Sequence, residues 1–351
     1  MLDTMRAAVL LSQGVVRIEA RPKPAAGPGM VLVRVRRAGI CGSDLHYFEH
    51  GRCGAFVPSG PFVLGHEFAG EVAEVGEGGS RSLLGQRVTA NPARACGFCE
   101  YCKAGRGNLC RRTIMLGSGS TVPPTDGAFA EYVCVRADQL HALPSEMDDA
   151  QGAMVEPLAV ALHAVKRAGG VSGLRVFISG GGPIGLLVAM VAKAHGAAFV
   201  ALSDVVAERR GIARSLAATD CTVDPLNSDS VETVRGATGG GFEVAFEASG
   251  AAAALVQAID LMRPGSRVVQ IGTHSQTVIP LPMNLIMNRE IELVGSMRYG
   301  NVFEEAINLI HHHRLPVRDL VTSVFPVEEI DAAMAAAADK VNAMKVHLTF
   351  D

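Results

Sequence analysis

Four cysteines lie within one short stretch of the chain. Cys96, Cys99, Cys102 and Cys110 follow the pattern C-x2-C-x2-C-x7-C, and glycines between them allow repeated tight turns. Four thiolates at such spacing are typical of a structural zinc, which is tetrahedral and closed to substrate. The alternative is a disulfide framework, which requires an oxidising compartment. Because nothing else in the sequence indicates secretion, the pattern predicts a structural zinc lobe at about residues 92–112.

A second group of potential metal ligands is spread over three separate motifs. Cys41 opens C-G-S-D-L-H, His66 and Glu67 end V-L-G-H-E, and Glu156 lies in M-V-E-P-L. Each residue taken alone could be structural. Together, a thiolate, an imidazole and one or two carboxylates suit a catalytic zinc that keeps one coordination position open.

Two residues that follow Cys41 could move a proton. Ser43 and His46 lie in the same predicted loop as Cys41. A hydroxyl and an imidazole can pass a proton between a substrate and solvent. We therefore expect Ser43 and His46, together with Glu156, to take part in catalysis.

A glycine-rich loop predicts dinucleotide binding. Gly180, Gly182 and Gly185 form G-G-G-P-I-G directly after an apolar strand and before the helical segment LLVAMVAKAHG. The glycines allow a tight turn, the approach of a pyrophosphate and close helix–strand packing, while the helix N-terminus offers free N–H groups. Asp204 ends the next predicted strand, where a carboxylate binds the adenosine ribose and repels a 2′-phosphate, so NAD is favoured over NADP. The alternative role for Asp204 is that of a helix N-cap. Arg209 could stack on adenine or contact a phosphate.

The pattern along the 351 residues indicates two kinds of domain. Residues 1–157 contain many short β-branched runs separated by glycine and proline, which predicts a β-rich, barrel-like lobe. Over residues 158–300, strands alternate with helices, which predicts an α/β fold with a doubly wound parallel sheet. We expect residues 301–351 to return to the first lobe, because the sheet before them is complete. The six predicted strands lie near residues 174–179, 199–204, 221–224, 242–249, 267–272 and 291–296.

Composition and charge exclude several classes of partner. The net charge is −3 and the charges are interspersed, which argues against nucleic acid and membrane surfaces. The most apolar run, residues 186–202, is interrupted by Lys193, His195 and Gly196, and the first residues lack the features of a signal peptide. We therefore expect a cytoplasmic protein that acts on a small molecule.

Several longer motifs together resemble one enzyme family. They include C-G-S-D-L-H-Y, V-L-G-H-E, the four-cysteine stretch, E-P-L-A-V-A-L-H-A, V-F-I-S-G-G-G-P-I-G and G-S-M-R-Y. Over essentially its whole length, the chain resembles the zinc-dependent medium-chain dehydrogenases. It is similar to their polyol branch, which contains the sorbitol, L-threonine 3- and L-idonate 5-dehydrogenases. The stretches N-P-A-R-A-C-G-F-C-E-Y-C and K-V-H-L-T-F most resemble the L-idonate enzymes.

The resemblance implies a GroES-like catalytic domain, a Rossmann domain, two zinc ions per chain, and NAD with NADP as a possible substitute. It implies a homotetramer or homodimer as the assembly. It also implies a role for each of several residues. Cys41, His66 and Glu67 are expected to ligate the catalytic zinc, with Glu156 close enough to hold its water or to exchange as a ligand; Ser43 and His46 form the proton relay; Ile184, Asp204 and Arg209 contact NAD; Tyr47, Arg298 and Tyr299 contact substrate.

The expected reaction is the reversible oxidation of a secondary alcohol, with L-idonate and its product 5-dehydro-D-gluconate as the favoured pair. Sorbitol or xylitol, and then L-threonine, are the alternative substrates. An alternative of another class is a non-catalytic member that only binds a nucleotide or senses redox state. The presence of all the expected metal ligands and relay residues argues against it.

Overall fold

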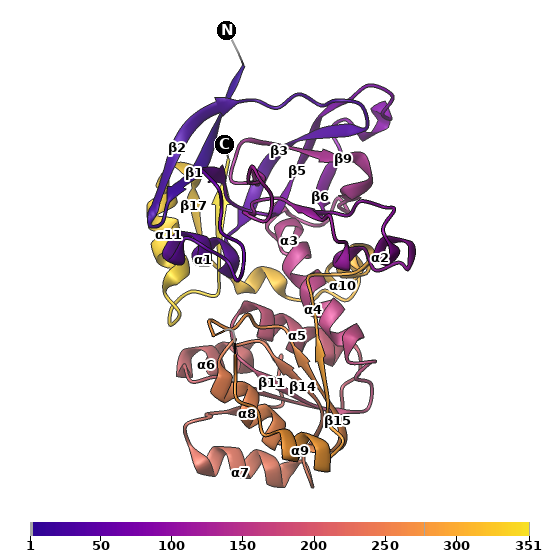
Figure 1. Cartoon of the computed structure of the whole chain (residues 1–351), viewed down its shortest axis with the longest axis vertical. Helices are drawn as coiled ribbons and strands as arrows, with labels where there is room; N and C mark the ends of the chain where they lie inside the picture. Colours follow the sequence, from indigo (N-terminus) through magenta and orange to yellow (C-terminus); the bar gives the residue numbers. More distant parts are fainter. Residues whose placement is uncertain (1–2, 277, 351) are drawn as a thin grey trace. The chain divides into compact units, whose positions relative to one another are not determined.

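The computed structural model describes residues 3–276 and 278–350, and the chain divides into two compact units. The first unit comprises residues 1–156, 303–339 and 343–351, and the second comprises residues 157–302 and 340–342. Figure 1 shows the two units as a β-rich part in indigo, purple and yellow and an α/β part in pink and orange. Each unit is described by itself below.

The first unit is built mainly on a seven-stranded sheet in which β3 is central. Its strands run in the order β10-β6-β5-β3-β18-β17, and β9 also pairs with β3. Valines dominate these strands, and the large side chains of Phe62, Phe68 and Phe129 are fully buried between them and a smaller three-stranded sheet, β2-β1-β4. The strands span β1 (Thr4–Ser12), β2 (Val15–Pro22), β3 (Met30–Gly39), β4 (Phe62–Val63), β5 (Glu67–Val75), β6 (Arg87–Ala90), β9 (Tyr132–Arg136), β10 (Leu140–Ala142), β17 (Val321–Pro326) and β18 (Lys345–Thr349).

The C-terminal segment is part of this sheet. Strand β18 pairs antiparallel with β3, so that His347 lies opposite Gly39 and Thr349 opposite Arg37. Two helices of the same segment, α10 (Phe303–His311) and α11 (Ile330–Ala338), belong to the first unit, and α11 packs against β17 and β18. Side chains at alternate positions of β18, including Lys345 and His347, therefore face the same side of the sheet.

Short helices of the first unit carry the candidate site residues. Helix α1 (Gly42–His50) begins directly after β3, and α3 (Asp149–Ala153) packs against β3 and β5. Helix α2 (Glu100–Lys103) lies in the cysteine-rich loop, whose ends are joined by the paired strands β7 (Ala93–Arg94) and β8 (Ile114–Met115).

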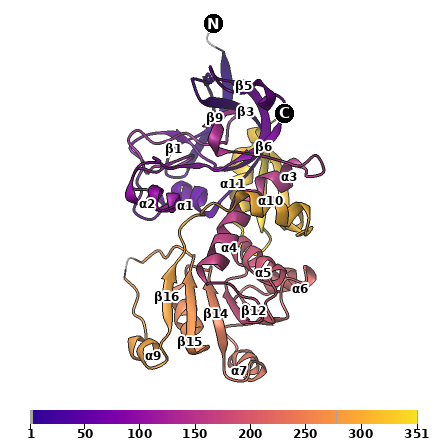
Figure 2. The same ribbon diagram turned by 90° about the vertical axis from the view of Figure 1, so that its right-hand side faces the viewer.

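The second unit contains the predicted six-stranded parallel sheet, in the order β13-β12-β11-β14-β15-β16. Figure 2 shows β12, β14, β15 and β16 in this succession. The order reverses between β11 and β14, and such a switch point is where ligands bind in open α/β sheets. The elements are β11 (Arg175–Ser179), α5 (Pro183–Ala194), β12 (Phe199–Ser203), α6 (Ala207–Ser215), β13 (Cys221–Val223), α7 (Ser228–Ala237), β14 (Phe242–Glu247), α8 (Ala252–Asp260), β15 (Met262–Gln270), α9 (Met283–Asn288) and β16 (Glu292–Gly295), with α4 (Val155–Arg167) before them.

Burial in the second unit follows from its sequence pattern. The central strands β11, β12 and β14 are buried along almost their whole length, as expected for a sheet with helices on both faces, and Phe177, Phe242 and Phe246 are fully buried. Across both units, no helix within the described residues is long and apolar enough to cross a membrane.

Candidate functional site

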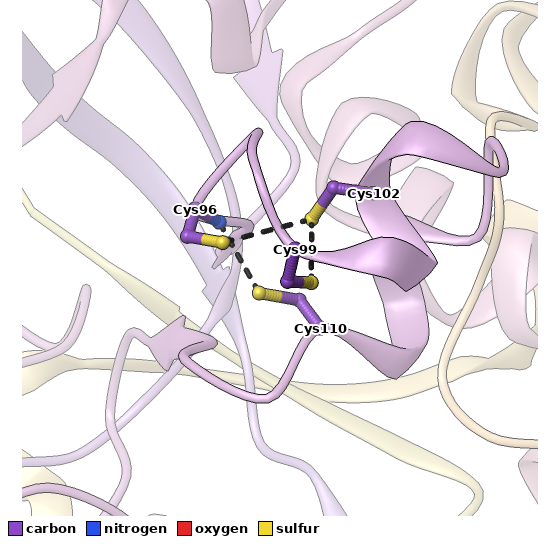
Figure 3. Close-up of side chains that lie close together, drawn as sticks. All are labelled: Cys96, Cys99, Cys102 and Cys110. Carbon is purple, nitrogen blue, oxygen red and sulfur yellow. Dashed lines mark hydrogen bonds between the residues drawn. The ribbon is translucent and has the colours of Figure 1, made fainter.

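The four sulfurs of the cysteine-rich loop point at one another (Figure 3). The Sγ atoms of Cys96 and Cys102 are 3.9 Å apart, and those of Cys99 and Cys102 are 3.4 Å apart. A tetrahedral zinc with Zn–S bonds of about 2.3 Å places its sulfurs roughly 3.8 Å from each other. All four cysteines are free thiols, so the structure contains no disulfide in this loop. The geometry fits a structural zinc.

Backbone donors around the cluster favour the thiolate form that binds metal. The N–H groups of Cys96 and Arg112 donate to Cys110 Sγ at 3.2 and 3.3 Å. Burial opposes the effect, but these donors lower the pKa of Cys110. A hydrogen bond from the backbone of Cys102 lowers the pKa of Cys99 to about 6. Because the thiolate is the metal ligand, these donors favour metal binding at Cys99 and Cys110, whereas burial and the hydrogen bond with Cys99 raise the pKa of Cys102 to about 12.

Loss of one of these ligands should affect folding more than chemistry. We expect purified protein to contain two equivalents of zinc and Cys96→Ser to contain one. Its unfolding midpoint should fall by several degrees, since each kcal/mol corresponds to roughly 2–4 °C in a domain of this size. Metal analysis and thermal unfolding check this, with Cys134→Ser as the matched cysteine control. A single equivalent of zinc in the unsubstituted protein would contradict the prediction.

A second group of ligands forms where β3 ends and β5 begins. Cys41 follows β3, His66 precedes β5, and Glu67 opens β5 opposite Gly39. The ligand atoms of Cys41, His66 and Glu67 all lie within 4.8 Å of one another. A side chain at Gly39 would come 2.3 Å from Glu67 Oε2, so glycine is required for the carboxylate to occupy this position. The structure thus brings together three ligands predicted from separate motifs.

Asp44 is a part of this site that the sequence analysis missed. It is fully buried in α1, where its carboxylate accepts hydrogen bonds from the Cys41 N–H at 2.9 Å and the Gly65 N–H at 3.1 Å. Its Oδ1 lies 3.8 Å from His66 Nδ1. Metal-ligating histidines commonly orient their second nitrogen toward a carboxylate. Asp44 therefore holds the backbone at Cys41 and Gly65 and places a carboxylate near the His66 ring, and its position within C-G-S-D-L-H was the available signal.

The electrostatics of this group favour a cation. Burial disfavours the charged form of His66, but the negative charges of Cys41 and Asp44 raise the pKa of the imidazole well above its ordinary value. In a buried group of this kind, positive charge is needed to balance the thiolate and the carboxylates. A divalent metal supplies that charge while leaving the imidazole free to ligate it, so the residues fit a zinc ion.

Lys345 is a second residue that the sequence analysis missed. Its Nζ lies 2.6 Å from Glu67 Oε1 and 2.5 Å from Oε2, and donates to the Ile40 carbonyl at 3.0 Å. Only 3% of Lys345 is exposed. Burial opposes ionisation, but the charges of Glu67 and Cys41 raise the pKa of the ammonium group. Glu67 is thereby held by a buried cation as well as being within reach of the metal position.

The relay residues follow Cys41 on the same helix. Ser43 and His46 both lie on α1 and are partly exposed, and the His46 ring meets that of His50 edge-on at 5.6 Å. Glu156 is buried at the start of α4, and its charge contributes to raising the pKa values of both His66 and Lys345. Its carboxylate is not one of the three mutually close ligand atoms. This separation favours Glu67 over Glu156 as the third ligand.

The residues predicted to contact substrate lie in different settings. Tyr47 is 2% exposed, packs edge-on against Phe62, and accepts a hydrogen bond from the Gly119 N–H at 3.0 Å. Tyr299 is also buried, whereas the preceding Arg298 is partly exposed and has a left-handed backbone with φ of 52°. Both of these residues follow β16 in the second unit, and Tyr47 belongs to the first.

The glycine-rich loop connects β11 to α5 as predicted. Gly180 has a φ of 102°, and a side chain at Gly185 would come 1.8 Å from the Gly180 carbonyl oxygen. Both positions therefore require glycine. Gly182 is the N-cap of α5, and Ile184 is the second residue of that helix. The free N–H groups of this helix end can face a phosphate.

Asp204 supports this loop. Its Oδ2 accepts a hydrogen bond from the Gly181 N–H and its Oδ1 accepts one from the Val206 N–H, both at 2.7 Å. Helix α6 has Val206 as its N-cap, so Asp204 does not have the alternative capping role. Arg209 Nη1 lies 4.0 Å from Asp204 Oδ2. The same atom is close to the loop, because a Cβ added at Gly182 would lie 3.5 Å from it. The aspartate, the arginine and the loop therefore form one cluster.

The second unit has a parallel sheet with a glycine-rich loop of the dinucleotide-binding type. The first unit has a four-cysteine centre and a separate Cys–His–Glu group. Together these features define a zinc-binding dehydrogenase. The model of the alcohol dehydrogenase GroES-like domain matches residues 27–145, and that of the zinc-binding dehydrogenase matches residues 183–312. The chain belongs to this zinc-dependent medium-chain dehydrogenase family and is an oxidoreductase acting on CH–OH groups.

Individual relatives narrow the class to polyol and sugar-acid dehydrogenases. The chain is 36% identical to sorbitol dehydrogenase of Bacillus subtilis, over 95% of this chain and 94% of the relative. It is 36% identical to L-idonate 5-dehydrogenase (NAD(P)(+)) of Escherichia coli, over 91% of each. The crystal structure of the Escherichia coli L-idonate 5-dehydrogenase matches with a TM-score of 0.92 and 34% identity, over 100% of this chain and 99% of that one. The crystal structure of a putative zinc-binding dehydrogenase from Sinorhizobium meliloti bound to NADP matches with a TM-score of 0.90 and 34% identity, over 99% of this chain and 100% of that one.

Proposed function

We propose that the protein reversibly oxidises the C5 hydroxyl of L-idonate to 5-dehydro-D-gluconate, with NAD as the preferred cofactor. The observation that carries this proposal is the match to L-idonate 5-dehydrogenase, in sequence over 91% of the chain and in fold over 100% of it. The second candidate is a sorbitol- or xylitol-type polyol dehydrogenase, which the equal identity to the Bacillus subtilis sorbitol dehydrogenase favours.

The chain's own residues would divide the work as follows. Cys41, His66 and Glu67 would hold the catalytic zinc, which would supply a Lewis acid that favours deprotonation of the substrate hydroxyl. His46 and Ser43 would pass that proton toward solvent. The glycine-rich loop and Asp204 of the second unit would hold the dinucleotide, which would supply a hydride acceptor.

Cofactor choice would depend on Asp204. In Asp204→Ser, the repulsion of a 2′-phosphate is removed while Arg209 remains, so the NADP-to-NAD ratio of kcat/KM should rise about tenfold or more. NAD affinity should also fall, because the Gly181 N–H loses its carboxylate partner. Steady-state kinetics with both cofactors check this, with the exposed Asp229→Ser as control. An unchanged ratio of kcat/KM for the two cofactors would show that Asp204 does not determine cofactor choice.

The substrate assignment is tested by a steady-state screen of L-idonate, sorbitol, xylitol and L-threonine, with NAD and NADP separately. We expect the highest kcat/KM for L-idonate. Turnover of sorbitol without turnover of L-idonate would overturn the assignment and leave the zinc-dependent reaction class in place.

Arg298 is the residue that we expect to separate a sugar acid from a neutral polyol, because a guanidinium binds a carboxylate through two parallel hydrogen bonds. Arg298→Ala should raise KM for L-idonate by roughly 10- to 100-fold, the equivalent of about 1.5–3 kcal/mol for a charged hydrogen bond. KM for sorbitol should rise much less, and Arg298→Lys should be intermediate. Equal losses on both substrates would show that Arg298 positions hydroxyl groups or cofactor instead.

A further inference from the structure

The first unit contains a polar cavity that belongs to neither group of metal ligands. It has a volume of about 430 Å³. Strands β3, β5 and β6, the first residue of α3 and the end of β18 supply its walls. The wall has no aromatic or large aliphatic side chain and includes three arginines. The lining residues are Arg36, Arg37, Gly70, Glu71, Arg87, Asp149 and Thr349.

Two of the three arginines are already neutralised. Arg36 Nη2 lies 3.4 Å from Glu71 Oε2, and Arg87 Nη2 lies 2.8 Å from Asp149 Oδ1. A second contact, from Arg87 Nε to the same oxygen, measures 3.3 Å. These pairs orient both guanidinium groups at the cavity wall, and their charges cancel.

Arg37 lies between these pairs and differs from them. Its Nε and Nη1 atoms are shielded from solvent and have no hydrogen-bond partner. Across residues 3–276 and 278–350, no carboxylate forms an ion pair with it. Shielded donors are almost always satisfied in native proteins, and the described residues supply no acceptor for these two N–H groups.

The deeper neighbours supply no negative charge to balance that of Arg37. His347 is fully buried on the same face of β18 as Thr349, and both of its ring nitrogens lack partners. Burial, together with the charges of Lys345 and Arg37, lowers the pKa of His347 to about 3, so the ring is neutral. The charge of Lys345 is balanced by Glu67. One unbalanced positive charge, that of Arg37, therefore remains at the cavity.

We propose that this cavity binds a tetrahedral oxyanion of the phosphate class, with Arg37 as its principal ligand and Arg36 and Arg87 at its rim. The uncompensated guanidinium charge attracts such an anion, and each of the two unpartnered N–H groups of Arg37 can donate to an anion oxygen. The Thr349 hydroxyl, whose bond to the Phe325 carbonyl is long at 3.4 Å, is a further donor. A carboxylate accepts the same charged hydrogen bonds, and the experiment separates the two classes of anion.

The test uses the zinc-loaded protein and inorganic phosphate at constant ionic strength. Phosphate binding is followed by 31P NMR line broadening and by calorimetry, and acetate is titrated in parallel. The variants are Arg37→Met, Arg37→Lys and, as the matched control, Arg34→Met, an exposed arginine of the same strand. Phosphate bound at the catalytic metal would be the same in all of these proteins, so only the difference between variants reports the cavity.

We expect saturable phosphate binding in the unsubstituted protein and in Arg34→Met. In Arg37→Met and Arg37→Lys, binding should be at least about tenfold weaker, since one lost charged hydrogen bond accounts for that factor. Phosphate should raise the unfolding midpoint of the first two proteins by about 2 °C or more and leave Arg37→Met unchanged.

Three results would overturn the proposal. Equal binding in Arg37→Met would show that phosphate lies elsewhere. Tighter binding of acetate than of phosphate would assign a carboxylate ligand. The absence of saturable phosphate binding in the unsubstituted protein would show that the cavity is not an anion site. If Arg37→Met does not fold, the comparison of Arg37→Lys with Arg34→Met decides the question.

Discussion

Replacement of Cys41 by serine is expected to abolish turnover while leaving the fold intact. Cys41 is the only thiol in the group with His66 and Glu67, and serine cannot supply a thiolate at neutral pH. Loss of the metal would remove several kcal/mol of stabilisation from the transition state, which corresponds to a decrease in kcat of roughly 10³-fold or more. Turnover, zinc content and folding are measured on the same sample by steady-state kinetics, zinc analysis and circular dichroism.

Cys53→Ser is the matched control for this prediction. Cys53 lies just beyond α1, close enough that burial and then the charge of Cys41 raise its pKa to about 11, yet it belongs to neither group of ligands. The Cys53→Ser variant should retain activity and both zinc ions. If Cys41→Ser kept two equivalents of zinc and lost activity only in proportion to unfolded protein, Cys41 would be structural.

Lys345→Met should produce the largest loss of stability among single substitutions at this site. The change leaves the buried Glu67 carboxylate without its cationic partner, and breaking a buried ion pair from one side typically costs about 3–5 kcal/mol. Urea unfolding of Lys345→Met and of Lys340→Met, an exposed lysine nearby, gives the difference.

A double-substitution cycle identifies the cause of that loss. Glu67→Gln in the Lys345→Met background removes the uncompensated charge, so the combined change in unfolding free energy should be smaller than the sum of the two single changes. Strict additivity would show that the two side chains do not interact.

The second unit could be predicted from the sequence almost element by element. Its central strands β11, β12 and β14 are buried on both faces and therefore form mainly apolar runs between turn residues. The largest difference in a boundary is at β15, which begins at Met262 although the predicted strand begins near residue 267. Pro264 and Gly265 resemble a turn in the sequence, but in the structure they form an irregularity inside the strand, with Gly265 at a φ of 72°.

The first unit could be predicted only as a class. Short β-branched runs indicate a β-rich lobe, but no local pattern specifies that β3 pairs with β5, β9 and β18. The same limit explains the site residues that were missed. Asp44 contacts the proposed ligands Cys41 and His66. It lies in the same motif as Cys41, Ser43 and His46, whose chemistry was assigned first. Lys345 has no local signal, because its partner Glu67 is 278 positions away.

That separation has a consequence for the protein during its synthesis. Ribosomes add roughly 5–20 residues per second, so Glu67 is made about 14 to 56 s before Lys345. During this interval β3 has no β18 beside it, and the carboxylate lacks its ammonium partner. The nascent chain therefore carries Cys41, His66 and Glu67 beside an unpaired edge of β3 until β18 has been made.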